Sequence, residues 1–111
     1  MKRLASVFLL LILFAQVISA AQVFGNLKVD DKSVGSGVEL RITCGDMLHK
    51  ATTDAYGSYN VFLPTSGRCW VKVFYQGQES QAYRIFSSSD PTRYDFDLQR
   101  LGDGSFVLKR R

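Results

Sequence analysis

The sequence contains little of what catalytic and metal sites are built from. It has one histidine, His49, and no cluster of cysteine, aspartate or glutamate residues accompanies it at ligand spacing. No nucleophile and orienting acid form a pattern with this histidine. The two cysteines, Cys44 and Cys69, lack the close Cys-x-x-Cys spacing of a redox site. We therefore expect no catalytic residues, no metal, no cofactor and no enzyme activity.

An excess of charge of one sign is also missing. The chain has 14 basic and 10 acidic residues, and two of the basic ones lie within residues 1–20. The remaining twelve basic and ten acidic residues give a net charge of only +2. This charge is too small to indicate a nucleic-acid partner. The basic residues 109–111 are interpreted as a solvated C-terminal tail.

Residues 4–18 form the one long apolar run of the sequence. Two basic residues precede this run, and small residues follow it at positions 19–21. The arrangement predicts a secretory signal peptide over residues 1–20, with an uncleaved N-terminal anchor as the alternative. The run is shorter than the roughly 20 residues that a membrane span needs, and a glutamine interrupts it. We therefore expect an exported domain of residues 21–111, periplasmic or secreted, without a membrane span after cleavage.

Sustained helical periodicity is absent after residue 20, and an alternation with a period of two takes its place. The predicted strands are residues 22–29, 37–44, 48–54, 58–63, 69–76, 81–86, 93–100 and 105–109. Short turns that contain glycine, proline, aspartate or serine separate these strands. Seven or eight short strands in about 90 residues predict an all-β, two-sheet sandwich that ends in a C-terminal hairpin.

Both cysteines fall on the inward phase of this alternation. Cys44 shares its phase with Ile42, and Cys69 shares its phase with Val71 and Val73. An even number of cysteines in an exported chain favours one disulfide, which would stabilise the domain rather than serve redox chemistry. Two separate buried thiols are the alternative.

Trp70 and Phe74 have the opposite, outward phase, and Lys72 lies between them. Exposed aromatic side chains on a flat sheet can stack on sugar rings or anchor a protein partner. We therefore predict a binding face, and Phe62 is expected to extend it because this residue is out of phase with the apolar residues of its own strand. The alternative is that this face is the core or is covered by the C-terminal hairpin, because large aromatic residues are usually buried.

One segment, residues 52–64, has a pattern more specific than alternation. Its motif residues are Thr53, Asp54, Gly57, Tyr59 and Pro64. They resemble the Thr-Asp-x-x-Gly-x-Tyr/Phe hairpin and the Leu-Pro turn of carboxypeptidase regulatory-like domains, and the resemblance extends over residues 23–99. It implies a Greek-key sandwich of the transthyretin or prealbumin type that acts as an accessory module and supplies no reaction. Tyr56 departs from the family, which commonly has an acidic residue or asparagine there.

These observations predict a non-catalytic binding module of the bacterial envelope. It would bind an envelope protein or polysaccharide through the aromatic sheet face or through the loops at one end of the sandwich. The alternative is a structural protein that joins other chains through strand edges, with residues 105–109 as a candidate edge. A third hypothesis, a small hydrolase of the transthyretin fold, requires histidine or serine residues gathered at one face.

Overall fold

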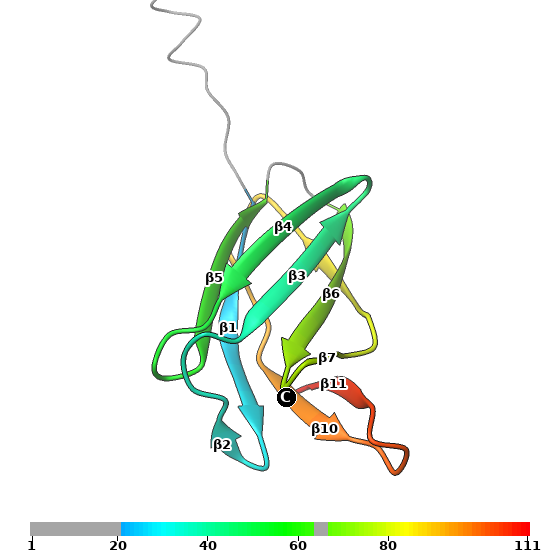
Figure 1. Ribbon diagram of the computed structural model, residues 1–111. Coiled ribbons are helices and arrows are strands. Elements are labelled where there is room, and N and C mark those ends of the chain that lie inside the picture. The colour runs from blue at the N-terminus through cyan, green and yellow to red at the C-terminus, as the bar shows by residue number, and fades with distance from the viewer. Residues whose placement is uncertain (1–20, 64–66) are drawn as a thin grey trace, which may run out of the picture.

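The chain forms a sandwich of two β-sheets (Figure 1). The computed structural model describes residues 21–63 and 67–111. The predicted signal peptide, residues 1–20, and Pro64 lie outside the described residues. In the part that the structure describes, no helix is long and apolar enough to cross a membrane. The prediction of an all-β sandwich is confirmed.

Eight longer strands build the two sheets, and three strands of two residues each extend them within the described ranges. The longer strands are β1 (Ala21–Val29), β3 (Glu39–Cys44), β4 (Met47–Thr52), β5 (Ser58–Leu63), β6 (Gly67–Tyr75), β8 (Tyr83–Ser87), β10 (Phe96–Arg100) and β11 (Phe106–Arg110). The short strands are β2 (Lys32–Ser33), β7 (Gln78–Glu79) and β9 (Thr92–Arg93). The predicted strand ends agree with these bounds to within two residues, except that the strand predicted over 93–100 is divided.

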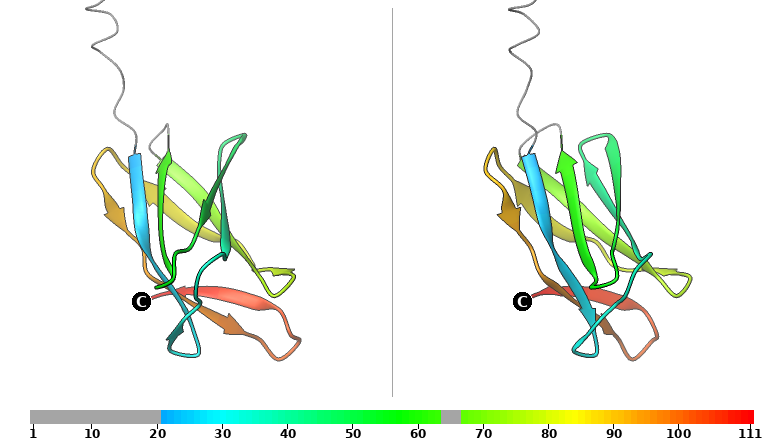
Figure 2. Two further views of the ribbon diagram at one scale, coloured as in Figure 1. Left: turned by 60° about the vertical axis from the view of Figure 1, so that its left-hand side comes forward. Right: turned by 90° about the vertical axis from the view of Figure 1, so that its left-hand side faces the viewer.

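The chain crosses between the sheets several times, which produces the Greek-key arrangement (Figure 2). In the first sheet, β1 pairs antiparallel with β5 and β2, and parallel with β9 and β10. β11 pairs with β10 and completes this sheet. The second sheet has the order β4-β3-β6, and both β7 and β8 pair with β6.

The core lies between the inner faces of the two sheets, where alternate side chains of each strand meet. The second sheet contributes Leu40, Ile42, Val71, Val73 and Ile85, which are almost completely buried. The first sheet contributes Val23, Leu27, Leu63, Phe96, Leu98 and Phe106. Burial of this apolar area is the main favourable contribution to folding. It also determines which side of each strand is left to face solvent.

The strand predicted over residues 93–100 is interrupted, so the prediction of one continuous strand is wrong. The Tyr94 N–H still donates to the Phe24 carbonyl at 2.8 Å, but the Asp95 side chain accepts from the Asn26 N–H at 2.9 Å. A Cβ atom on Gly25 would lie 1.9 Å from the Tyr94 carbonyl oxygen. Glycine is therefore required here because the two backbones approach closely.

Residues 109–111 are exposed, as the interpretation of a solvated tail expects, but Arg110 and Arg111 also contact the first sheet. The Arg110 guanidinium lies 4.2 Å from the ring centre of Tyr94, a cation–π contact. The Arg111 N–H donates to the Asp95 carbonyl at 2.8 Å, and its side chain pairs with Asp97 at 3.2 Å. These contacts fix the end of β11 on the strands that precede it.

Candidate binding face

A disulfide joins Cys44 and Cys69, which confirms the predicted bridge and excludes two separate thiols. The cysteines are 25 residues apart in sequence, and their Cα atoms lie 4.4 Å apart on the neighbouring strands β3 and β6. Cys69 is fully buried on the inner face, directly before Trp70 in the chain. The bridge therefore fixes the strand that carries the predicted aromatic face.

The hairpin motif residues form contacts within the domain that stabilise its fold. Asp54 Oδ1 accepts hydrogen bonds from the N–H groups of Tyr56 at 2.9 Å and Ser58 at 3.0 Å, which forms the turn between β4 and β5. Gly57 has a φ of 76°, and a Cβ atom there would lie 2.8 Å from the Leu27 carbonyl oxygen. Both the positive φ and the close approach to β1 require glycine.

Two further motif residues bond to backbone groups of neighbouring segments. The buried Thr53 hydroxyl donates to the Gly35 carbonyl at 2.7 Å and accepts from the Val38 N–H at 3.0 Å. The Tyr59 hydroxyl donates to the Tyr94 carbonyl at 2.6 Å, and burial raises the pKa of Tyr59 well above its ordinary value. The four described motif residues thus stabilise the fold, and Pro64 lies outside the described residues.

Tyr94 continues this network to the edge of the second sheet. Its hydroxyl accepts from the Phe86 N–H at 3.0 Å and lies 3.3 Å from the Phe86 carbonyl oxygen, to which it can donate. Phe86 belongs to β8, the strand that pairs with β6 by the opposite backbone edge. A side-chain hydroxyl therefore binds backbone groups that another strand would otherwise bind.

The structure places Trp70, Lys72 and Phe74 on the outer face of the second sheet. Trp70 is 44% exposed and Phe74 is 39% exposed, and Lys72 is exposed between them. Phe74 packs under the Arg41 guanidinium, which lies 4.9 Å from the ring centre. We call this surface the Trp70 face and define it by the outward residues of β3, β4, β6 and β8.

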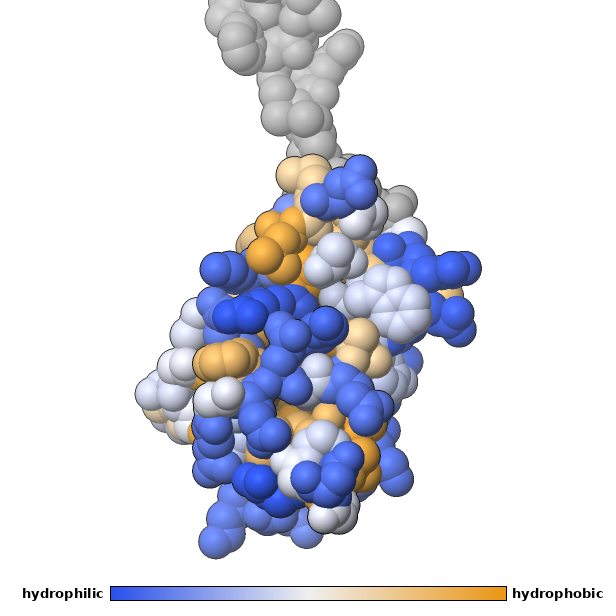
Figure 3. All heavy atoms as spheres, turned by 45° about the vertical axis from the view of Figure 1, so that its right-hand side comes forward, coloured by the Kyte–Doolittle hydropathy of each residue, from blue (hydrophilic) through white to orange (hydrophobic). Residues whose placement is uncertain are grey.

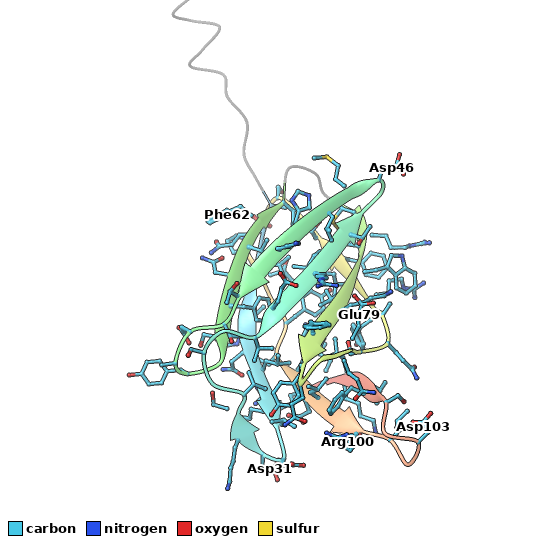
Figure 4. The ribbon with its side chains drawn as sticks, in the orientation of Figure 1. Asp31, Asp46, Phe62, Glu79, Arg100 and Asp103 are labelled. Atoms are coloured by element: carbon cyan, nitrogen blue, oxygen red, sulfur yellow. A yellow bond between two sulfur atoms is a disulfide. The ribbon has the colours of Figure 1, made fainter. Side chains whose placement is uncertain are left out.

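Phe62 does not belong to the Trp70 face, so the prediction that it extends this face is wrong. It is 59% exposed and lies on β5 (Figure 4). This strand pairs with β1 in the first sheet, where Phe62 lies opposite Gln22. The outer faces of a two-sheet sandwich point in opposite directions. Period-two phase tells which side of its own sheet a residue occupies, but not which sheet the strand joins.

The strand register brings three residues to Trp70 that the sequence analysis did not select. Arg84 lies directly opposite Trp70, and Phe86 lies opposite Arg68 two residue pairs further along β6 and β8, on the same face. The Arg84 guanidinium lies 5.4 Å from the ring centre of Phe86. The sequence did contain a signal for the outward position of Arg84 and Phe86, since both flank the inward residue Ile85. Alternation alone, however, does not identify the strand with which theirs pairs.

The two ends of the Trp70 face differ in charge. At the Phe74 end, Glu39 and Glu79 pair with Arg41 at 2.7 and 3.1 Å, and Glu79 also pairs with Lys72 at 3.4 Å. The hydrogen bond that Arg41 donates to the Glu39 carboxylate is the main reason that the pKa of Arg41 is raised. Near Trp70, by contrast, no carboxylate of the described chain forms an ion pair with Arg68 or Arg84.

The described side chains form no metal-binding group at this face. Among the described residues, no three histidine, cysteine, aspartate or glutamate side chains lie close enough to hold a metal ion. His49 lies opposite Ile42 on β4, and its Nε2 atom is buried without a hydrogen-bond partner in the described structure. A hollow of about 370 Å³ beside the β1–β2 turn is lined by Asp30, Asp31 and Asp97, and is separate from the Trp70 face.

Comparisons with known proteins establish the fold. No family model and no curated protein matches the sequence. Among solved structures, the Bacillus anthracis TIE protein superposes with a TM-score of 0.60 and 14% identity, over 71% of this chain and 16% of that chain. A DUF3823 family protein from Parabacteroides merdae gives a TM-score of 0.55 and 6% identity, over 85% of this chain and 48% of that chain.

At these identities the likeness shows the β-sandwich fold alone. The chain spans less than half the length of either of these proteins. The resemblance to carboxypeptidase regulatory-like domains is thereby supported at the level of the sandwich, and no matching family model identifies the family.

Proposed function

We propose that this protein is an exported, non-catalytic binding module of the bacterial envelope that recognises a polysaccharide or a protein through the Trp70 face. The observation that carries the proposal is the exposure of Trp70 and Phe74 on a sheet whose opposite side is fully packed. Burying a large apolar side chain contributes about 1.5–3 kcal/mol, and these two partly exposed residues forgo part of that contribution in the isolated domain. Exposed aromatic rings of this kind are common anchors for ligands.

Export is supported by two features that agree with each other. The predicted signal peptide over residues 1–20 directs a chain out of the cytoplasm. The Cys44–Cys69 disulfide is of the kind that forms and persists in oxidising compartments such as the periplasm.

The alternative hypothesis, assembly through strand edges, has weaker support. The predicted edge at residues 105–109 corresponds to β11, where the Phe106 carbonyl already accepts from the Gln81 N–H at 2.9 Å. The β8 edge is bonded at Phe86 by the Tyr94 hydroxyl. Both contacts reduce the number of backbone groups that an added strand would bind.

A capture experiment with matched variants tests the proposal. Protein expressed from the full chain is immobilised and incubated with separate polysaccharide and protein fractions of the cell envelope. Trp70→Ala/Phe74→Ala should lose the captured material, whereas Phe62→Ala, on the opposite outer face, should retain it. The proposal is wrong for this face if the double variant, shown to be folded by circular dichroism, captures the same material as the wild type. Loss with Tyr56→Ala instead would locate binding at the end loop.

A further inference from the structure

Four residues around Trp70 form a square on two neighbouring strands. Trp70 and Arg84 are one directly opposed pair, and Arg68 and Phe86 are the next such pair on the same face. In an antiparallel ladder, directly opposed side chains are separated by about 5 Å at Cβ and diagonal neighbours by about 7–8 Å. The two aromatic rings therefore occupy one diagonal, and the two guanidinium groups occupy the other.

No carboxylate of the described chain neutralises the cations of this square, and the Arg84 guanidinium, which lies 5.4 Å from the ring centre of Phe86, must turn from that ring toward a ligand carboxylate. Neither Arg68 nor Arg84 has a carboxylate partner among the described residues, whereas Arg41 and Lys72 further along the face are paired with glutamates. Asp46 lies at the tip of the β3–β4 turn (Figure 4), and no described ion pair links it to the square. The Trp70 end thus offers uncompensated positive charge beside exposed aromatic surface.

This combination matches one class of sugar chemistry. A uronic acid ring carries an apolar C–H face, which stacks on an aromatic ring, and a carboxylate, which a guanidinium binds through two parallel hydrogen bonds. We propose, building on the proposed function, that the Trp70 end of the face binds an acidic polysaccharide. Trp70 and Phe86 stack on successive sugar rings, and Arg68 and Arg84 bind their carboxylates.

Other anionic macromolecules fit this surface less well. A single-stranded nucleic acid needs a positive groove that follows its backbone, but Glu39 and Glu79 end the run of positive charge at Phe74. A membrane surface needs a continuous apolar patch to insert. Figure 3 shows instead a mosaic in which hydrophilic side chains surround smaller pale and orange areas. The aromatic and guanidinium side chains around Trp70 alternate over a short distance. This spacing suits a ligand in which apolar ring faces alternate with carboxylates.

Trp70 is the sole tryptophan of the chain, so its fluorescence reports directly on the site. Protein expressed from the full chain is titrated with oligogalacturonate and with an alginate oligomer, and a neutral glucan oligomer of equal length is the matched control. We expect a saturable change in Trp70 emission with at least one uronate, weakened by added salt because ion pairs are screened. The neutral oligomer should bind at least about tenfold more weakly, since it cannot make the charged hydrogen bonds.

Charge variants separate the square from the rest of the face. Arg84→Gln and Arg68→Gln should each weaken uronate binding by about tenfold, because each removes one charged donor group. Lys32→Gln removes the same charge from β2 in the first sheet, outside the Trp70 face, and should leave the affinity within about twofold.

Each contrary outcome has a distinct meaning. Equal binding of the neutral oligomer, without an effect of Arg84→Gln, overturns the acidic ligand and leaves the proposed function intact. The same holds if neither uronate binds while envelope capture still depends on Trp70 and Phe74. A dT15 oligonucleotide or phosphatidylglycerol vesicles that bind more tightly than both uronates would assign the surface to another ligand class. If the Trp70→Ala/Phe74→Ala variant captures the same envelope material as the wild type, both the proposed function and the acidic ligand are contradicted.

Discussion

The hairpin motif and the Trp70 end use their polar groups in opposite ways. In the hairpin, Asp54, Thr53 and Tyr59 direct their side-chain oxygens to the chain's own backbone. At the Trp70 end, Arg68 and Arg84 have no carboxylate partner among the described residues. The residues that carry the sequence resemblance therefore explain why the sandwich forms, and they contain no information about what it binds.

The comparison makes a general prediction about substitutions. Changes around the hairpin and the strands that it contacts should reduce the free energy of unfolding, because they remove bonds within the fold. Changes on the Trp70 face should alter binding while leaving stability close to that of the wild type. The following four experiments test this separation, in order of decreasing effect on stability.

Gly25→Ala should have the largest effect. The added Cβ would lie 1.9 Å from the Tyr94 carbonyl oxygen, so β1 and the Tyr94 segment must move apart. We expect a loss of about 4 kcal/mol or more in the free energy of unfolding, measured by urea denaturation. Gly102→Ala is the matched control, because nothing lies within 4 Å of its added Cβ. A wild-type midpoint for Gly25→Ala would contradict the close approach.

Removal of the disulfide should come next. Cys44→Ala/Cys69→Ala releases a constraint across 25 residues of sequence and should cost about 3 kcal/mol, chiefly by raising the entropy of the unfolded chain. Thermal melts of the variant and of the wild type with and without reductant measure this loss. If the reduced wild type melts at the same temperature as the oxidised protein, the bridge does not stabilise the strand beneath the Trp70 face.

Tyr59→Phe removes one hydroxyl from the hairpin network. The Tyr94 carbonyl would lose its 2.6 Å donor in a buried position, and we expect a loss of about 1–2 kcal/mol. Denaturant unfolding provides the measurement, and binding by the folded variant should equal that of the wild type. Loss of binding without loss of stability would reverse the roles assigned to the two regions.

Trp70→Ala/Phe74→Ala should have the smallest effect on stability. Both side chains are substantially exposed, so we expect a change of less than about 1 kcal/mol. The same variant is expected to lose the ligand completely. If the free energy of unfolding falls by more than about 2 kcal/mol, these aromatic residues stabilise the sheet rather than bind a partner. The contrast between the two regions would then be wrong.

The sequence was sufficient to predict most of the sandwich because alternation is a local signal. It gave the correct inward phase for Cys44 and Cys69 and the outward phase for Trp70 and Phe74. Alternation does not report partners, and for that reason Phe62 was placed on the wrong face. Arg84 and Phe86 were missed as neighbours of Trp70 for the same reason, since the pairing of β6 with β8 sets their positions.

The interruption between β9 and β10 was invisible for a related reason. Tyr94, Phe96 and Leu98 are all buried, so the inward phase continues across the break. The backbone pairing is what changes at the break. The Tyr94 carbonyl approaches Gly25 closely, and the Asn26 N–H donates to the Asp95 side chain instead of to a strand carbonyl. A pattern of side-chain polarity does not record where backbone hydrogen bonds go.

The Tyr94 hydroxyl has a consequence for the order in which the chain folds. It reaches Phe86 of β8 from a residue whose own N–H is bonded to Phe24 of β1, so both contacts exist only after the C-terminal segment has docked. Until then, the backbone at Phe86 is open and can template another chain, as unpaired edges do in aggregation. Newly synthesised molecules should therefore be most prone to self-association before residues 92–111 have docked, and the bonds of the Tyr94 hydroxyl to Phe86 then close this part of the β8 edge.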